Sequence, residues 1–188
     1  MVNLRLDALK QRFPSLQALD PAPVKDCPTI RLTAPGETLA VLTELKRAHG
    51  FDYLDFITAI DWKGPVSLAG FVKNPNPNPF LPERATPQSS VTATPGFVYK
   101  DVFEVVYAMT DLATLERLMV RVELPRAVAR IASAVTLWNA ADWQEREIFD
   151  LFGIIFEGHP NLVKILTPDF TEGHPLRKDY VHIKDRYD

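Results

Sequence analysis

The side chains in this sequence that could carry acid–base or metal chemistry are four histidines and a scatter of carboxylates. His159 and His174 each stand in a Glu-Gly-His-Pro repeat, and they could form a hydrolase metal site with Asp169 or Glu172 if the chain doubled back. No two of the histidines have the His-x-x-x-His or His-x-His spacing with which one helix or strand holds zinc. The pattern gives such a site little support.

Three aspartates between residues 50 and 62 and a lone cysteine are the other candidates. Asp52, Asp55 and Asp61 have no nearby histidine or glycine-rich loop, which favours edge or turn residues over a metal or paired-carboxylate site. Because Cys27 is the only cysteine, the chain can form neither an internal disulfide nor a cluster held by four of its own cysteines. We therefore expect Cys27 to be a small buried residue in a strand.

Sequence motifs for the common catalytic and cofactor sites are missing. There is no Gly-x-Ser-x-Gly elbow, no phosphate-binding glycine loop and no dinucleotide fingerprint. A net charge of −3 gives no electrostatic case for nucleic acid. No run of 18 apolar residues could span a bilayer. We therefore predict no catalytic, cofactor-binding or metal site within this chain.

A helix is predicted just before the histidine repeats. Asp142 followed by Glu145 is a capping-box pattern, and Gly153 is a plausible stop. The Glu145 carboxylate is expected either to bond to the first turn or to face something outside the chain. The helix has one apolar face, and its opposite face is predicted to be solvated and is formed by Arg146, Glu147 and Asp150.

After this helix the sequence changes character. The two Gly-His-Pro turns, at 158–160 and 173–175, break up the chain because proline excludes the helical region for the residue before it. Residues 157–188 are therefore predicted to form an extended C-terminal tail that lies along a surface, either of this domain or of a partner.

Residues 137–180 closely resemble the signature of one protein family, the 30 kDa-type (C) subunit of the proton-pumping NADH:quinone oxidoreductase, respiratory complex I (NDH-1). The resemblance is dense over this stretch and looser upstream, and an ungapped combination of this length is specific. The residues that carry it, called the signature residues below, are Glu145, Arg146, Glu147, Asp150, Phe152, Gly153, Phe156, Gly158, His159, Pro160, Lys164, Gly173, His174, Pro175, Arg177, Lys178, Asp179 and Tyr180.

The resemblance implies a peripheral-arm subunit that binds no cofactor itself, while FMN, Fe–S clusters and quinone belong to partner subunits. It implies contact with the subunit that lines the quinone pocket and with its Fe–S neighbours, on the cytoplasmic side of the inner membrane and only indirectly attached to it. In that setting Arg177 and Lys178 would pair with acidic groups of a neighbour. The expected apolar anchors are Phe149, Phe152, Ile155 and Phe156.

Two alternatives stay open at this point. The family has relatives in membrane-bound hydrogenases and ferredoxin-dependent oxidoreductases, where a similar domain docks to a nickel-iron subunit. The other alternative is the free-standing metal hydrolase described above. Within a complex, His159 and His174 could also relay protons or tune a potential.

The elements that position the tail are predicted over residues 1–156, as an α+β domain. Apolar periodicity predicts helices over 1–14, 39–50 and 127–139, and strands over 27–33, 51–62, 98–109 and 118–124. The last strand alternates cleanly, which predicts one buried and one solvated face. Residues 63–97 are a Pro-rich loop. Together these patterns predict a mixed, largely antiparallel sheet packed with helices.

Overall fold

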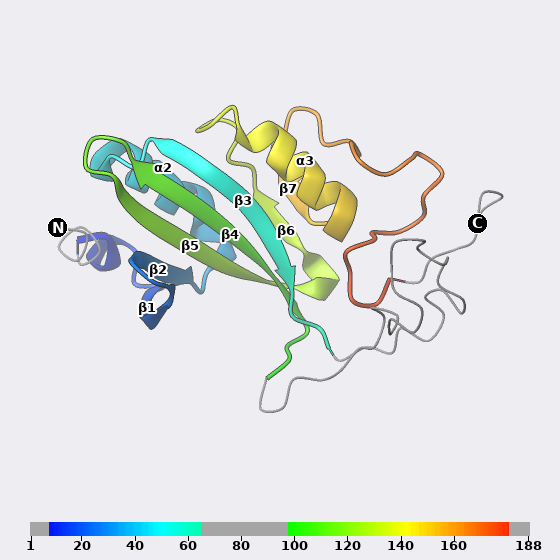
Figure 1. The fold of residues 1–188 in the computed structure, drawn as a ribbon, viewed down its shortest axis with the longest axis horizontal. Helices are drawn as coiled ribbons and strands as arrows, with labels where there is room; N and C mark the ends of the chain where they lie inside the picture. The colour runs from blue at the N-terminus through cyan, green and yellow to red at the C-terminus, as the bar shows by residue number, and fades with distance from the viewer. Residues whose placement is uncertain (1–7, 65–97, 181–188) are drawn as a thin grey trace, which may run out of the picture.

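A computed structural model describes residues 8–64 and 98–180 of the chain (Figure 1). The first part of the predicted N-terminal helix, the predicted Pro-rich loop from residue 65 onward and the end of the tail, including His182, lie outside the described residues. Residues 8–12 are helical, which agrees with the end of that first helix. Over the described ranges, no helix combines the length and the apolar character required to cross a bilayer.

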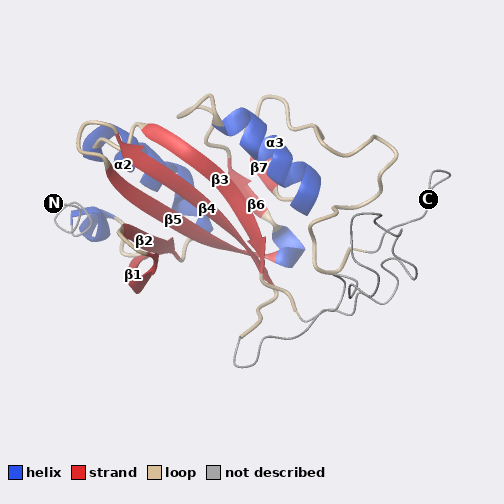
Figure 2. Ribbon diagram, viewed as in Figure 1, coloured by secondary structure: helices blue, strands red, loops and turns tan. Residues whose placement is uncertain are grey.

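A five-stranded sheet with helices forms the domain (Figure 2). Its strand order is β1 (Leu16–Val24), β2 (Cys27–Leu32), β5 (Glu116–Pro125), β4 (Val102–Asp111) and β3 (Tyr53–Asp61). All neighbouring pairs are antiparallel except β2 and β5, which are parallel. The predicted α+β fold with a mixed, largely antiparallel sheet is confirmed. The strand β1 was not predicted, because its two prolines and polar residues hide the apolar alternation.

Helix α2 (Thr38–His49) covers one face of the sheet. Val41, Leu42 and Leu45 are almost completely buried and join Ile30, Tyr107 and the other apolar side chains of that face in the core. The helix ends at Gly50, whose φ of 78° is the left-handed conformation that favours glycine at this position. The predicted helix, its stop and the one-sided burial of β5 are confirmed.

Helix α3 (Ala141–Phe152) lies along the outer edge of β3 (Figure 1). The Gln144 side chain accepts a hydrogen bond from the Ile57 N–H, and the Trp138 indole N–H donates to the Asp52 carbonyl over 2.8 Å. An uncovered strand edge is a template for aggregation, and α3 removes this liability from β3. The same contacts fix α3 relative to the sheet.

The predicted helix over 127–139 is wrong. The chain forms a short 3₁₀ turn η2 (Arg126–Val128) and strand β6 (Arg130–Ala132), which pairs in parallel with β7 (Ile155–Glu157). Ala129, Ile131 and Ser133 are buried at every second position, which is strand spacing, and pairing with β7 overrides the weak helix propensity of the segment. A second 3₁₀ turn, η1 (Pro35–Glu37), leads into α2.

Candidate functional site

The signature residues meet where the C-terminal tail lies against α3. Within this region Glu145 is completely buried, and its carboxylate accepts hydrogen bonds from the Ser133 hydroxyl over 2.6 Å and the Ala134 N–H over 2.7 Å. Helix α3 has no side-chain cap at Ala140. Both predicted roles for Glu145, the capping box and the external partner, are therefore wrong: it binds the turn after β6.

Burial makes Glu145 an unusual carboxylate. Removal from water raises its pKa from 4.5 to about 7, and the nearby Asp142 adds to this, while the bonds from Ser133 and Ala134 act in the opposite direction. The neighbouring Tyr107 is also completely buried, and both burial and the charge of Glu145 raise the pKa of its phenol. The pair lies inside the domain, between α3 and β4.

Asp150 holds the first part of the tail. Its carboxylate accepts the backbone N–H groups of Ile165, Leu166 and Thr167, over 3.0, 2.7 and 2.9 Å, and the Thr167 hydroxyl. Burial raises the pKa of Asp150, but the hydrogen bonds from Thr167, Leu166 and Ile165 outweigh it and the pKa is lowered. The predicted solvated face is wrong for this residue, which is completely buried.

The second part of the tail satisfies the end of α3. The last carbonyls of a helix have no partner within it. Here the His174 ring Nδ1 lies 2.8 Å from the Asp150 carbonyl, the Leu176 N–H donates to Leu151 over 3.0 Å, and the Arg177 Nε donates to Phe152 over 2.5 Å. The tail therefore acts as the C-terminal cap of the helix.

Gly153 makes this close approach possible. It ends α3 with φ of 71°, and its N–H donates to the Phe149 carbonyl over 2.9 Å. A Cβ atom at this position would collide with the His174 ring and the Arg177 guanidinium. The predicted helix stop is confirmed, and glycine is needed there for both conformation and space.

Arginine and aspartate side chains fasten the end of the tail. Arg126 bonds to Asp61 over 2.5 Å and to Asp179 over 2.6 Å, and the Lys178 N–H donates to Asp61 over 2.8 Å. The Arg126 and Arg177 guanidinium carbons lie 4.4 and 5.2 Å from the centre of the Phe103 ring. Asp61 is thus a buried ion-pair residue rather than only a strand-end residue, and sequence reasoning missed Arg126 because no local pattern marks it.

The two histidines are separated by the length of α3. His159 Nε2 lies 3.2 Å from the Asp142 carbonyl, and its Nδ1 accepts the Asn161 N–H over 3.0 Å. His174 contacts the Asp150 carbonyl, eight residues further along the helix and so about 12 Å away. The structure does not bring His159 and His174 together as the hydrolase hypothesis requires. Among residues 8–64 and 98–180, no three His, Cys, Asp or Glu side chains are grouped to hold a metal ion.

The remaining signature residues divide between core and surface. Phe152 and Phe156 are buried in the core, so they are not exposed anchors for a neighbour, contrary to the expectation for them. Lys164 donates to the Thr171 carbonyl over 2.7 Å, and Arg146 to the Val163 carbonyl over 3.3 Å. Between residues 157 and 180, the exposed large apolar side chains are Val163, Leu166, Phe170 and Leu176. Cys27 is a free, buried strand residue, as predicted.

These features define a class of protein: a small α+β domain whose most characteristic charged residues bind a C-terminal tail along one helix. The chain belongs to the family described as respiratory-chain NADH dehydrogenase, 30 Kd subunit, which matches residues 32–186. The predicted resemblance to the 30 kDa-type subunit of complex I is confirmed.

Individual relatives are members of the same family. The C subunit of NADH-quinone oxidoreductase from Moorella thermoacetica is 33% identical over 175 residues, 93% of this chain and 92% of the relative. The corresponding protein of Citrifermentans bemidjiense is 53% identical over 78 residues, which cover 42% of this chain and 48% of the relative. The most similar part of the chain thus spans about half of that protein.

Solved structures agree on the fold. The trypsin-resistant fragment (1–134) of Nqo5 has a TM-score of 0.53 at 26% identity, covering 86% of this chain and 98% of the fragment. A chain of the archaeal membrane-bound sulfane sulfur reductase has a TM-score of 0.62 at 18% identity, covering 99% of this chain and 94% of that one. The second likeness shows a shared fold alone.

Proposed function

We propose that this chain is a structural subunit of a proton-translocating NADH:quinone oxidoreductase, with no redox centre and no catalytic site of its own. FMN, Fe–S clusters and quinone would be bound by partner subunits, which carry electrons from NADH to quinone. The chain would lie on the cytoplasmic side of the inner membrane and reach the membrane only through the complex. Its contribution would be a rigid surface for assembly.

One observation carries this proposal: the charged signature residues are used within the chain. Glu145 and Asp150 are completely buried, and the donors His174 and Arg177 face backbone carbonyls of α3. Groups engaged in this way hold the tail in one shape. A surface that is already ordered before binding loses less conformational entropy on association.

The tail presents an apolar surface to a partner. Leu166 and Phe170 are 59% and 62% exposed, and Val163 and Leu176 lie on the same tail, 46% and 51% exposed. Large apolar side chains of this kind contribute most to interface energetics. We infer that this apolar surface of the tail contacts the subunit that lines the quinone pocket.

Co-purification tests the proposal. The tagged full-length chain should co-purify with the other peripheral-arm subunits, and Phe170→Ser together with Leu166→Ser should reduce its incorporation at least tenfold without unfolding it. Arg177→Ala should impair assembly before it alters turnover. Variants that assemble normally and lose quinone reduction would contradict a purely structural role.

Substitution of His159 tests the proton-relay hypothesis. The Asn161 N–H donates to His159 Nδ1, which leaves the proton on Nε2, 3.2 Å from the Asp142 carbonyl, so both ring nitrogens have partners. His159→Gln in the assembled complex should leave quinone reduction per assembled complex unchanged. A loss of turnover at unchanged assembly would support the relay.

A further inference from the structure

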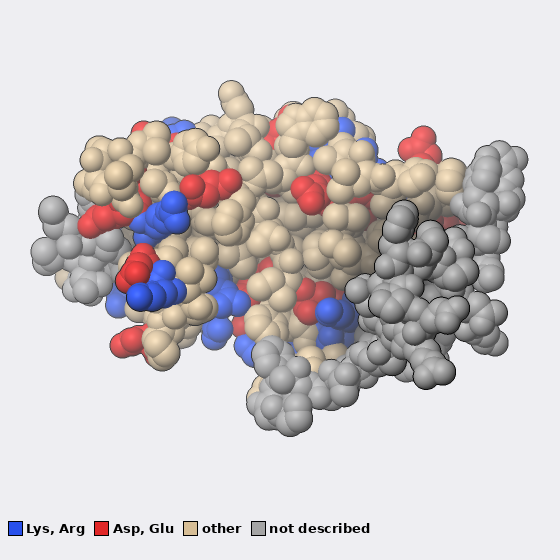
Figure 3. Space-filling model, in the orientation of Figure 1, with Lys and Arg blue, Asp and Glu red and all other residues tan. Residues whose placement is uncertain are grey.

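The sheet face turned away from α2 has two unlike halves. In one half, charged side chains pair with one another: the buried Glu104 pairs with Arg121 and accepts the Trp62 indole N–H over 2.9 Å, and Lys100 pairs with Glu123 over 2.6 Å. In Figure 3, which shows this side of the molecule, charged side chains gather toward the ends of the sheet and uncharged surface covers its middle.

The other half of the face is apolar. Phe56, Ala108 and Met119 are directly opposite one another in register across β3, β4 and β5. Phe56 is 40% exposed, and Val24 at the β1–β2 turn is 45% exposed. The solvated face of an antiparallel sheet is ordinarily polar. The exposed apolar side chains of this half are therefore unusual for a sheet face that only contacts water.

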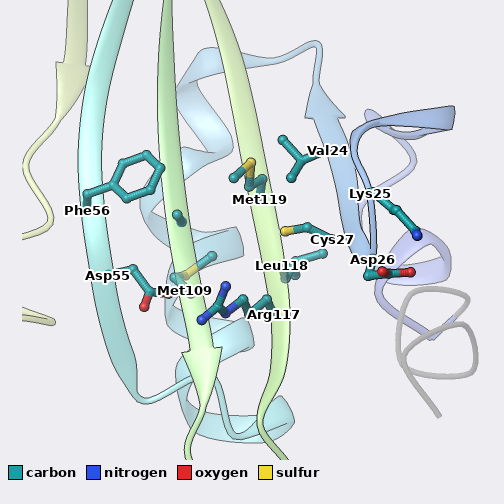
Figure 4. A pocket seen from close by; sticks show the side chains of 11 residues that line it. Val24, Lys25, Asp26, Cys27, Asp55, Phe56, Met109, Arg117, Leu118 and Met119 are labelled. Carbon is teal, nitrogen blue, oxygen red and sulfur yellow. The ribbon is translucent and has the colours of Figure 1, made fainter.

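A cavity of about 320 Å³ lies over this apolar row (Figure 4). Its physical cause is the short side chain of Ala108 between the longer Phe56 and Met119, which leaves a hollow across β4. Val24 and Cys27 approach Met119 from the β1–β2 side, and Phe56 bounds the opposite side. This size fits one or two large side chains of a partner.

One end of the cavity is polar and contains Asp55 and Arg117, whereas the other charged lining residues, Lys25 and Asp26 at the β1–β2 turn, point away from Arg117 (Figure 4). Asp55 lines this end, but its carboxylate already accepts the Thr110 hydroxyl over 2.7 Å. The exposed Arg117 lines the same end, and no side chain in the described part of the chain forms an ion pair or hydrogen bond with its guanidinium. A guanidinium beside an apolar hollow is complementary to a carboxylate beside an apolar side chain.

We propose that this cavity is a second docking site, which receives a segment of a neighbouring subunit that presents an apolar side chain next to a carboxylate. A protein segment fits better than a small molecule because a second exposed aromatic side chain lies beyond the hollow: Tyr53 of β3 is 51% exposed and pairs with Thr110, two residues from Ala108, on the same face of the sheet. The site lies at the β1–β2 end of the sheet, whereas the tail docks at the other end (Figure 1). The proposal of this second docking site rests on the proposed function, namely that the chain is part of an assembly, but the site is on a different surface from the tail.

Site-specific photo-crosslinking in the purified complex tests this inference. A photoreactive phenylalanine analogue replaces Phe56 in one preparation and Phe170 in another, so that the second preparation reports the tail surface. We expect the Phe56 position to form an adduct with one other polypeptide, mapped to a peptide that contains Asp or Glu beside an apolar residue. Arg117→Glu should lower the yield of that adduct at least fivefold. Arg47→Glu, an exposed arginine on α2, is the matched charge reversal and should leave it unchanged.

The outcomes separate this inference from the proposed function. An adduct at the Phe170 position without one at Phe56 would overturn the second site and leave the tail surface intact. An adduct of Phe56 with a second copy of this chain or with lipid would also overturn it, as would a Phe56 adduct whose yield Arg117→Glu does not change. Loss of the Phe170 adduct alone would contradict the tail surface instead.

Discussion

The sheet and the tail of this protein are held by different forces. In the sheet, apolar side chains such as Ile30, Val105 and Val120 are completely buried, and the strands form continuous hydrogen-bonded ladders. In the tail as far as Tyr180, few side chains are buried, and order comes from polar contacts to α3 and to the Asp61–Arg126 pair. Removing one side chain from the sheet eliminates one of many stabilising contacts, whereas removing one polar side chain that binds the tail eliminates a large part of the interactions that hold the tail.

Substitution of Asp150 should give the largest difference between the stability of the tail and that of the sheet. Asp150→Ala leaves three N–H groups and one hydroxyl of the 165–167 segment without their acceptor, at a cost of about 3–4 kcal/mol to tail docking. Limited proteolysis should then cleave within 159–180 while the sheet stays intact. Glu147→Ala, an exposed residue on the same helix, is the control. Cooperative loss of the whole domain would show that tail and sheet form one unit.

Glu145 should give the core a pH dependence of its own. Because its folded pKa is raised from 4.5 to about 7, the folded state binds more protons in this range, and stability falls as pH rises from about 4.5 to about 7. The full effect is up to about 3 kcal/mol. Denaturant unfolding at a series of pH values should show this slope in the wild type and lose it in Glu145→Gln. An unchanged slope in the variant would assign it to another group.

Three glycine-to-alanine substitutions can distinguish the cost of backbone strain from the cost of a steric clash. Gly153→Ala combines an unfavourable positive φ with a clash against His174 and Arg177, and should weaken tail docking by about 2 kcal/mol. Gly158→Ala has the positive φ but open space, and should cost about 1 kcal/mol. Gly36→Ala has neither and is the control. Docking of the tail is measured by its protease sensitivity. If Gly153→Ala and Gly158→Ala weaken docking equally, the clash with His174 and Arg177 makes no contribution.

Acid should loosen the tail, although with the smallest effect. Burial lowers the pKa of His174 below 6.5, and Arg177 and Lys164 lower it further, against the bond to the Asp150 carbonyl. The folded tail therefore disfavours the protonated ring, and its docking is complete above pH 6.5 and weakens as pH falls below that value. This response is opposite in sign to that of Glu145. In NMR spectra, the backbone resonances of the tail should show conformational exchange on acidification while those of the sheet do not. His174→Gln should abolish this difference.

The predictability of the two regions follows from the same contrast. Strands β3, β4 and β5 and helix α2 are marked by local apolar periodicity, so the α+β class could be predicted. The roles of Glu145, Asp150 and Asp61 could not, because their partners are 11 to 117 residues away in the sequence and a buried carboxylate has the same local pattern as a solvated one. Likewise β6 exists only because β7 pairs with it. The family resemblance identified the signature residues, but not the contacts they make within their own chain.

Hydrogen exchange of the isolated, full-length chain tests the central claim most directly. If α3 holds the tail without any partner, the amides of Ile165, Leu166, Thr167 and Leu176 should be protected in the wild type. Asp150→Ala should remove the protection of the first three and leave β4 and β5 unchanged. Free exchange of these amides in the wild-type chain, with protection only in the assembled complex, would contradict the account.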